Sequence, residues 1–125
     1  MKVSIIIGSD SDWPILKPAV EILKSFGIES EVIVASAHRT PAKVREVVLS
    51  APEKGIGAFI VAAGAAAHLA GVVASYTTLP VIGVPINATP LNGMDALLST
   101  EVREVLGEQH IRIRNTYRVV LLLIP

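Results

Sequence analysis

The residues best suited to chemistry are six in a row, Ser36-Ala37-His38-Arg39-Thr40-Pro41. They place a hydroxyl, an imidazole and a guanidinium side by side. An unperturbed histidine, with a pKa near ~6.5, exchanges protons at neutral pH, and an arginine offers a rigid fork to an anion such as phosphate. The stretch therefore predicts a site that holds an anion and moves a proton. Alone, a His beside an Arg on a loop is more often a solvated surface pair than a catalytic one, so other segments must support the functional interpretation.

These six residues lie between an apolar run typical of a strand, Val32 to Ala35, and a helical pattern that starts at Pro41. Thr40 is expected to cap that helix, and Pro41 suits its first position. The second strand-helix unit is expected to cover residues 31–51. A strand-to-helix turn of an open parallel sheet is where such folds collect ligands.

The same strand-turn-helix order recurs along the chain. Strands are expected at 3–7, 58–63 and 80–85, and helices at 15–26, at about 64–76 and from 95. In the first helix, Ser11 or Asp12 is expected to cap, and Pro18 to cause a kink or a late start. Four successive βα units predict a flavodoxin-like three-layer α/β/α sandwich with a central parallel sheet.

This architecture also organises the polar residues. The carboxyl ends of parallel strands share one edge of the sheet, so four segments should converge there: Gly8 to Asp12, Ser36 to Arg39, Gly64 to His68, and Ile86 to Asn92. The first segment suits an anion at a helix N-terminus, or equally an ordinary helix cap. The third is poor in side chains, which allows close approach by a ligand or close packing of a helix.

Composition restricts the class of protein. The 125 residues fit a single domain, 1–125. A formal net charge of zero argues against nucleic-acid binding, and the absence of cysteine excludes disulfides and thiolate chemistry. No stretch reads as a signal peptide or a membrane span. We therefore expect a cytoplasmic protein without nucleic-acid or membrane partners.

The three histidines, His38, His68 and His110, lie in unrelated segments without metal-ligand spacing. No G-x-S-x-G motif supports a serine hydrolase. We expect neither a metal nor a cofactor. Residues 101–109 keep a helical pattern, 111–114 and 117–124 read as a hairpin, and 119–124 could supply a fifth strand.

Taken together, four motifs resemble the class I N5-carboxyaminoimidazole ribonucleotide mutases of purine biosynthesis, the PurE family. They are Gly8-Ser9-Asp10-Ser11-Asp12-Trp13-Pro14, Ser36-Ala37-His38-Arg39-Thr40-Pro41, Gly64-Ala65-Ala66-Ala67-His68-Leu69 and Leu91-Asn92-Gly93-Met94-Asp95-Ala96-Leu97-Leu98-Ser99. The match covers residues 1–100 in order and at the expected spacing. Each motif is weak alone, but the set is specific.

The resemblance implies a metal-free and cofactor-free enzyme that moves a carboxylate from the exocyclic nitrogen of an aminoimidazole ribonucleotide to ring carbon C4, by loss and recapture of CO₂. It implies His38 as the general acid and base. It implies a substrate site formed by Ser9, Asp12, Ser36, Arg39, Gly64, Ala65, His68 and Leu69. It further implies a homo-oligomer, which is an octamer in the family.

The sequence also departs from the family. Ala62 and Ala65 stand where the family often has Gly, Ala70 stands where it often has Pro, and the divergent tail 101–125 lacks the family's Gln-Met-Pro segment and terminal helices. A truncated or frameshifted reading frame and a genuinely short variant both explain the tail. Two alternatives to the mutase stay open: a non-catalytic ribonucleotide-binding or assembly module, and a direct carboxylase. Class II relatives carboxylate directly, but Arg39 and His68 resemble class I more closely.

Overall fold

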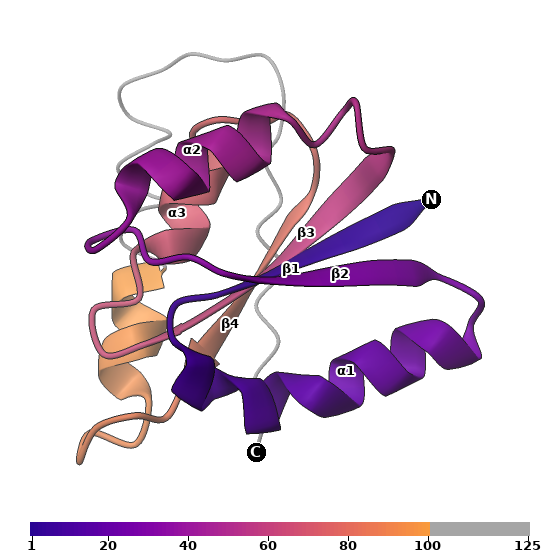
Figure 1. The fold of residues 1–125 in the computed structure, drawn as a ribbon. Coiled ribbons are helices and arrows are strands. Elements are labelled where there is room, and N and C mark those ends of the chain that lie inside the picture. The colour runs from indigo at the N-terminus through magenta and orange to yellow at the C-terminus, as the bar shows by residue number, and fades with distance from the viewer. Residues whose placement is uncertain (101–125) are drawn as a thin grey trace.

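A computed structural model describes residues 1–100 of the chain (Figure 1). The elements expected at 101–109, 111–114 and 117–124 lie outside the described residues. In order, the elements are β1 (Lys2–Ile7), the 3₁₀ turn η1 (Asp10–Asp12), α1 (Trp13–Ser25), β2 (Glu29–Val34), α2 (Pro41–Leu49), β3 (Ile56–Gly64), α3 (Leu69–Ala74) and β4 (Val81–Ile86). Residues 94–100, orange in Figure 1, are also helical.

The four strands form one parallel sheet in the order β2-β1-β3-β4. β1 pairs with β2 from Lys2 opposite Glu29 to Ile7 opposite Val34. From β1 the chain continues to β2 on one side of β1 and then to β3 on its other side, so the strand order changes direction between β1 and β3. Flavodoxin-like folds bind ligands at this point of the sheet. The order and the parallel pairing confirm the predicted fold class.

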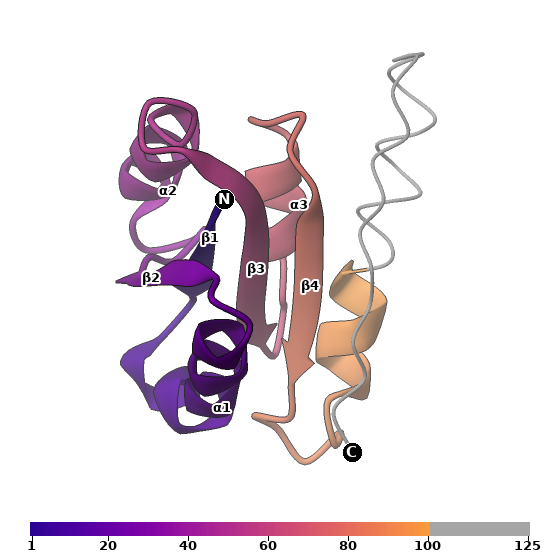
Figure 2. The same cartoon turned by 90° about the vertical axis from the view of Figure 1, so that its right-hand side faces the viewer.

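Helices cover both faces of the sheet (Figure 2). Alternate side chains of β1 explain why, since Ile6 belongs to the core under α2 and α3, whereas Ile5 and Ile7 belong to the core over α1. Burial on both faces accounts for the continuous apolar runs of the strands. The largest fully buried side chain, Phe59, lies in the α2 and α3 core.

Several element boundaries differ from the prediction. β2 begins at Glu29, three residues before the apolar run that signalled it, and ends at Val34. α3 spans only Leu69–Ala74, whereas a helix over 64–76 was expected. The backbone of Ala65 has φ 52°, a left-handed conformation that a right-handed helix cannot contain. The stretch before Leu69 is therefore a turn.

The expectation of a late start for the first helix is wrong, because α1 begins at Trp13 and continues through Pro18. Proline at position 18 cannot donate to the carbonyl of Pro14, but Pro14 is exposed in the first turn, where water can satisfy that carbonyl. None of the described helices is both long and apolar enough to cross a membrane.

Candidate active site

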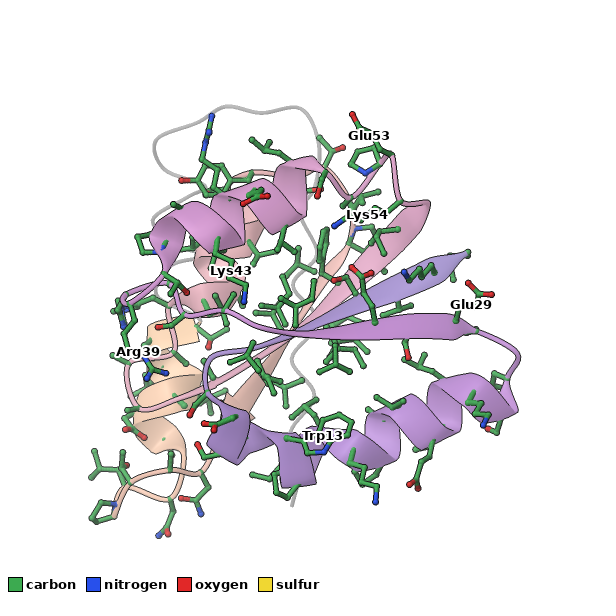
Figure 3. All side chains as sticks on the ribbon, viewed as in Figure 1. Trp13, Glu29, Arg39, Lys43, Glu53 and Lys54 are labelled. Atoms are coloured by element: carbon green, nitrogen blue, oxygen red, sulfur yellow. The ribbon has the colours of Figure 1, made fainter. Side chains whose placement is uncertain are left out.

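An open cleft of about 240 Å³ lies where β1, β2 and β3 end. Figure 3 shows Arg39 at this end of the molecule and Glu29 at the opposite end of β2. The cleft is lined by eight of the residues proposed for the site: Ser9, Asp12, Ser36, His38, Arg39, Gly64, Ala65 and Leu69. His68 lies beside it, in contact with His38. Segments far apart in sequence thus meet at one edge of the sheet.

The turn after β1 is held by its own side chains. The carboxylate of Asp12 accepts a hydrogen bond from the backbone N–H of Ser9 at 3.1 Å, and the Ser11 N–H donates to the Ser9 hydroxyl at 3.4 Å. Ser9 is therefore the capping residue, and it caps η1. Ser11 does not cap, and Asp12 occupies the position before α1 without a side-chain capping bond.

Asp12 is the buried charged residue of the cleft, with 6% of its surface exposed. Burial raises the pKa of its carboxyl group, the Ser9 N–H lowers that pKa, Asp10 raises it and Arg39 lowers it. Burial outweighs the rest because the charged form loses its hydration. The cleft therefore contains a carboxyl group held close to a guanidinium and readier than usual to carry a proton.

The turn after β2 presents His38 and Arg39. Thr40 occupies the N-cap position of α2 as predicted, but its side chain makes no capping bond. Its hydroxyl instead accepts from the Ser36 N–H at 2.9 Å and donates to the Ser36 carbonyl at 3.2 Å. The Ser36 hydroxyl accepts from the N–H groups of His38 and Arg39, at 3.3 and 3.2 Å. These bonds close the turn, and Pro41 starts α2 as expected.

Arg39 connects this turn to the first one. Its Nη2 donates to the carbonyl of Gly8 at 2.9 Å. That bond uses one of the five donors of the guanidinium, so the others remain available to a ligand. The cation is thereby fixed beside the turn that carries Ser9 and Asp12, which is the arrangement needed to hold an anionic group with its remaining N–H groups.

His38 is paired with His68. Nε2 of His38 lies 3.0 Å from Nδ1 of His68, and the two rings are nearly perpendicular, at 86°. One nitrogen must donate and the other accept, so the tautomers of the two rings are complementary. Since Nε2 of His38 is used in this bond, a proton exchanged there is shared with His68. The pair is an arrangement for holding and moving a proton.

Small residues shape the third side of the cleft. A Cβ added at Gly64 would lie 2.5 Å from Cβ of Ala88, so Gly64 is required by packing. Ala65 adopts the left-handed conformation described above. The Ser99 hydroxyl accepts from the N–H of Ala67 at 2.8 Å. Backbone and methyl groups therefore form this wall.

The cleft contains further residues that the prediction did not assign to the site: Gly8, Ser11, Ala37, Ala63, Ala66 and Ala88. Alternation along a strand could have indicated Ala63, which lies two residues after the buried Val61. Ala88 and Ser99 have no local signal, because their relation to the cleft depends on packing across 24 to 34 residues. Among residues 1–100, no three His, Asp or Glu side chains gather as metal ligands would.

The sequence matches known proteins over this same region. A family model described as AIR carboxylase matches residues 2–103. N5-carboxyaminoimidazole ribonucleotide mutase from Thermotoga maritima is 55% identical over 98 residues, which cover 78% of this chain and 57% of that protein. The Pyrococcus horikoshii protein of the same name is 55% identical over 97 residues, which cover 78% of this chain and 55% of that protein.

A solved structure agrees on the fold. The crystal structure of Treponema denticola PurE superposes with a TM-score of 0.72 at 24% sequence identity, and the match covers 98% of this chain and 71% of that one. The chain spans little more than half the length of the two curated relatives.

Proposed function

This chain belongs to the AIR carboxylase family, and from that premise we propose that it acts as an N5-carboxyaminoimidazole ribonucleotide mutase, an isomerase of purine biosynthesis. It would move a carboxylate from the exocyclic nitrogen of the aminoimidazole ring to ring carbon C4. Relatives that carry this name are 55% identical over 98 and 97 residues, and the family model matches residues 2–103, which include every residue of the cleft. The sequence resemblance to the class I enzymes points the same way.

In this proposal Arg39, Ser9 and Asp12 bind the ribose phosphate. The guanidinium faces the phosphate while its Nη2 stays bonded to Gly8. The Ser9 hydroxyl, which donates to Asp10 at 3.2 Å in the free protein, turns to the phosphate as a second donor. Asp12 accepts from a ribose hydroxyl, a role for which a buried, anchored carboxylate is suited. Ser36 supports the turn that carries Arg39.

His38 moves the proton. Loss of CO₂ from the exocyclic nitrogen requires a proton at that nitrogen, and attack of C4 on the released CO₂ is followed by loss of the C4 proton. One imidazole that gives the first proton and takes the second returns to its starting state, so the isomerisation consumes nothing. His68 keeps the His38 ring in one orientation. The alanine-rich wall and Leu69 provide an apolar surface that helps retain CO₂ and exclude water.

The observation that carries the proposal is the meeting of His38, Arg39 and Asp12 in one cleft. The acid-base group and the fixed cation come from the turn after β2, and the buried carboxyl group comes from the turn after β1. A phosphorylated substrate whose ring gains and loses a proton requires groups of these kinds. A cytoplasmic location, expected from the composition, and assembly into a homo-oligomer, implied by the sequence resemblance, belong to the same proposal.

The test is an absorbance assay of the purified full chain for interconversion of the two carboxylated aminoimidazole ribonucleotides, without ATP or added bicarbonate. His38→Asn should lower the rate by at least about 100-fold while ribonucleotide binding stays within a few fold. Glu53→Gln, an exposed change at the opposite end of the sheet, should leave both unchanged.

Other outcomes of these measurements would contradict parts of the proposal. Turnover that requires bicarbonate and the uncarboxylated ribonucleotide would indicate a direct carboxylase. Binding without turnover by the folded wild type would indicate a ribonucleotide-binding module. A fully active His38→Asn protein would overturn the assigned role of His38.

A further inference from the structure

Apart from His68 itself, the turn that carries this histidine has no polar side chains. Residues Ala65, Ala66 and Ala67 precede the histidine, and Ala65 is held at φ 52°. A left-handed alanine is less stable than its right-handed form by about 1–2 kcal/mol. The turn therefore keeps this conformation only because contacts from elsewhere hold it.

Ser99 supplies the closest of these contacts. Its hydroxyl, on the helix at 94–100, accepts from the Ala67 N–H at 2.8 Å and donates within its own helix to the carbonyl of Asp95 at 2.7 Å. Ala67 is 2% exposed, so water has little access to its N–H. An unpaired N–H at such a place is unfavourable, and Ser99 is the partner that satisfies it.

The neighbouring hydroxyl acts on the same residue. Thr100, which is buried, has its Oγ1 3.3 Å from the Ala67 carbonyl and 2.8 Å from the Ala96 carbonyl. Both polar backbone groups of Ala67 thus face hydroxyls from a helix more than 30 residues later in the chain. Of the two hydrogen bonds, that of Ser99 is the shorter.

Ala67 is followed directly by His68, whose Nδ1 lies 3.0 Å from Nε2 of His38. A separation of about 3.6 Å no longer counts as a hydrogen bond, so a shift of about 0.6 Å that moved His68 away from His38 would break the pair. We propose that Ser99 is a positioning residue, which fixes His68 through the Ala67 N–H and thereby sets the ring orientation and tautomer of His38. The consequence for turnover rests on the proposed function, whereas the effect on the histidine pair does not.

The first test measures the histidine pair in the free, full-length protein by ¹⁵N NMR of the imidazole nitrogens. Ser99→Ala should change the ring-nitrogen signals of both His38 and His68. Ser99→Thr, which retains the hydroxyl, should keep the wild-type pattern. Ser75→Ala is the matched control, since the Ser75 hydroxyl donates to a carbonyl of its own helix at 2.7 Å and has no contact in that turn.

The second test measures turnover. Ser99→Ala should lower kcat by about tenfold with KM changed less than about twofold, because substrate binding does not pass through Ala67. A purely structural role would instead reduce the folded fraction and leave kcat per folded molecule unchanged. Ser99→Thr should restore kcat.

Unchanged His38 and His68 signals in a folded Ser99→Ala protein would overturn the inference. If that variant does not fold, amide hydrogen exchange of the wild type decides. The Ala67 amide should exchange at least ten times more slowly than the Ser11 amide, whose acceptors are exposed, and equal rates would overturn the inference. Altered histidine signals in a protein whose wild type shows no turnover would support the inference and refute the mutase.

Discussion

The two turns that flank the cleft are held in opposite ways. In the turn after β1, the side-chain bonds among Ser9, Asp10, Ser11 and Asp12 join residues at most three apart, and Arg39 adds one long-range bond, to the Gly8 carbonyl. In the turn after β3, the side-chain bonds to the alanine backbone come from Ser99 and Thr100, more than 30 residues away. The first turn is therefore held mainly by local bonds, and the second depends on tertiary packing.

This difference separates the parts of the site that tolerate change from those that do not. Apart from the buried Asp12, the polar side chains of the first turn are exposed or half-buried, so that water can replace a lost partner. In the second turn, Ala67 is buried and Gly64 is tightly packed against Ala88, so at these two positions a lost partner or an added methyl group has no substitute. The same substitution should therefore have different effects at equivalent positions of the two turns.

The largest expected contrast is between the glycines that end β3 and follow β1. Gly64→Ala should destabilise the protein by about 1–3 kcal/mol, because its Cβ would lie 2.5 Å from Cβ of Ala88 and 3.2 Å from the Ile86 carbonyl oxygen. Gly8→Ala should change the free energy of unfolding by less than about 0.5 kcal/mol, since its nearest neighbour is at an ordinary 3.5 Å. Urea denaturation of both variants measures the difference.

A double variant checks the cause. Adding Ala88→Gly to Gly64→Ala removes the 2.5 Å contact and leaves the one with Ile86, so it should recover part of the lost stability. Equal stability of the Gly64→Ala and Gly8→Ala proteins would contradict the comparison.

The next contrast is between the two serine hydroxyls. Ser99→Ala leaves the buried Ala67 N–H without its acceptor, which should cost about 1–3 kcal/mol. Ser9→Ala should cost only about 0.5 kcal/mol, at the low end for a capping residue, because the Ser11 N–H also donates to Asp10 at 3.0 Å. Thermal denaturation of the two variants compares them, and a larger loss for Ser9→Ala would reverse the assignment.

The same contrast explains what could be predicted from sequence. Hydrophobic runs are local, and they predicted the four strands and the fold class correctly. Convergence of the turns followed from the parallel sheet. The prediction failed where a side chain had more than one possible hydrogen-bond partner, or where the partners lie far apart in the sequence. The Thr40 hydroxyl bonds to Ser36 instead of making a capping bond to α2, and nothing in the sequence around Ala65 predicts its left-handed backbone.

Asp12 gives a prediction about pH. Its pKa is raised chiefly by burial, so the folded protein binds a proton at Asp12 more readily than the unfolded chain. The resulting stabilisation is present below the ordinary pKa of 3.8 and is lost as pH rises through the raised pKa. Asp12→Asn, whose amide oxygen can still accept from the Ser9 N–H, should therefore gain stability relative to wild type as pH rises through that interval.

Glu31 provides the control of opposite sign. The hydrogen bond from Lys2, at 2.7 Å, lowers the pKa of Glu31. Its stabilisation is present above the ordinary pKa of 4.5 and is lost as pH falls through the lowered pKa. Glu31→Gln should thus lose stability relative to wild type at neutral pH. Chemical denaturation between acid and neutral pH measures both variants, and slopes of the same sign would contradict the assigned causes.

The smallest expected effect is at Ala65, which stands where the resembling family often has glycine. Ala65→Gly removes a left-handed strain of about 1–2 kcal/mol and adds unfolded-state entropy that opposes folding by about 0.4–1 kcal/mol. The net result should be a gain of about 0.5 kcal/mol. Ala66→Gly, one residue later and without a positive φ, has only the entropic term and should lose stability. Opposite signs for the two adjacent alanines, measured by urea denaturation, would show that the backbone of Ala65 is strained, whereas a loss of stability in both variants would contradict that strain.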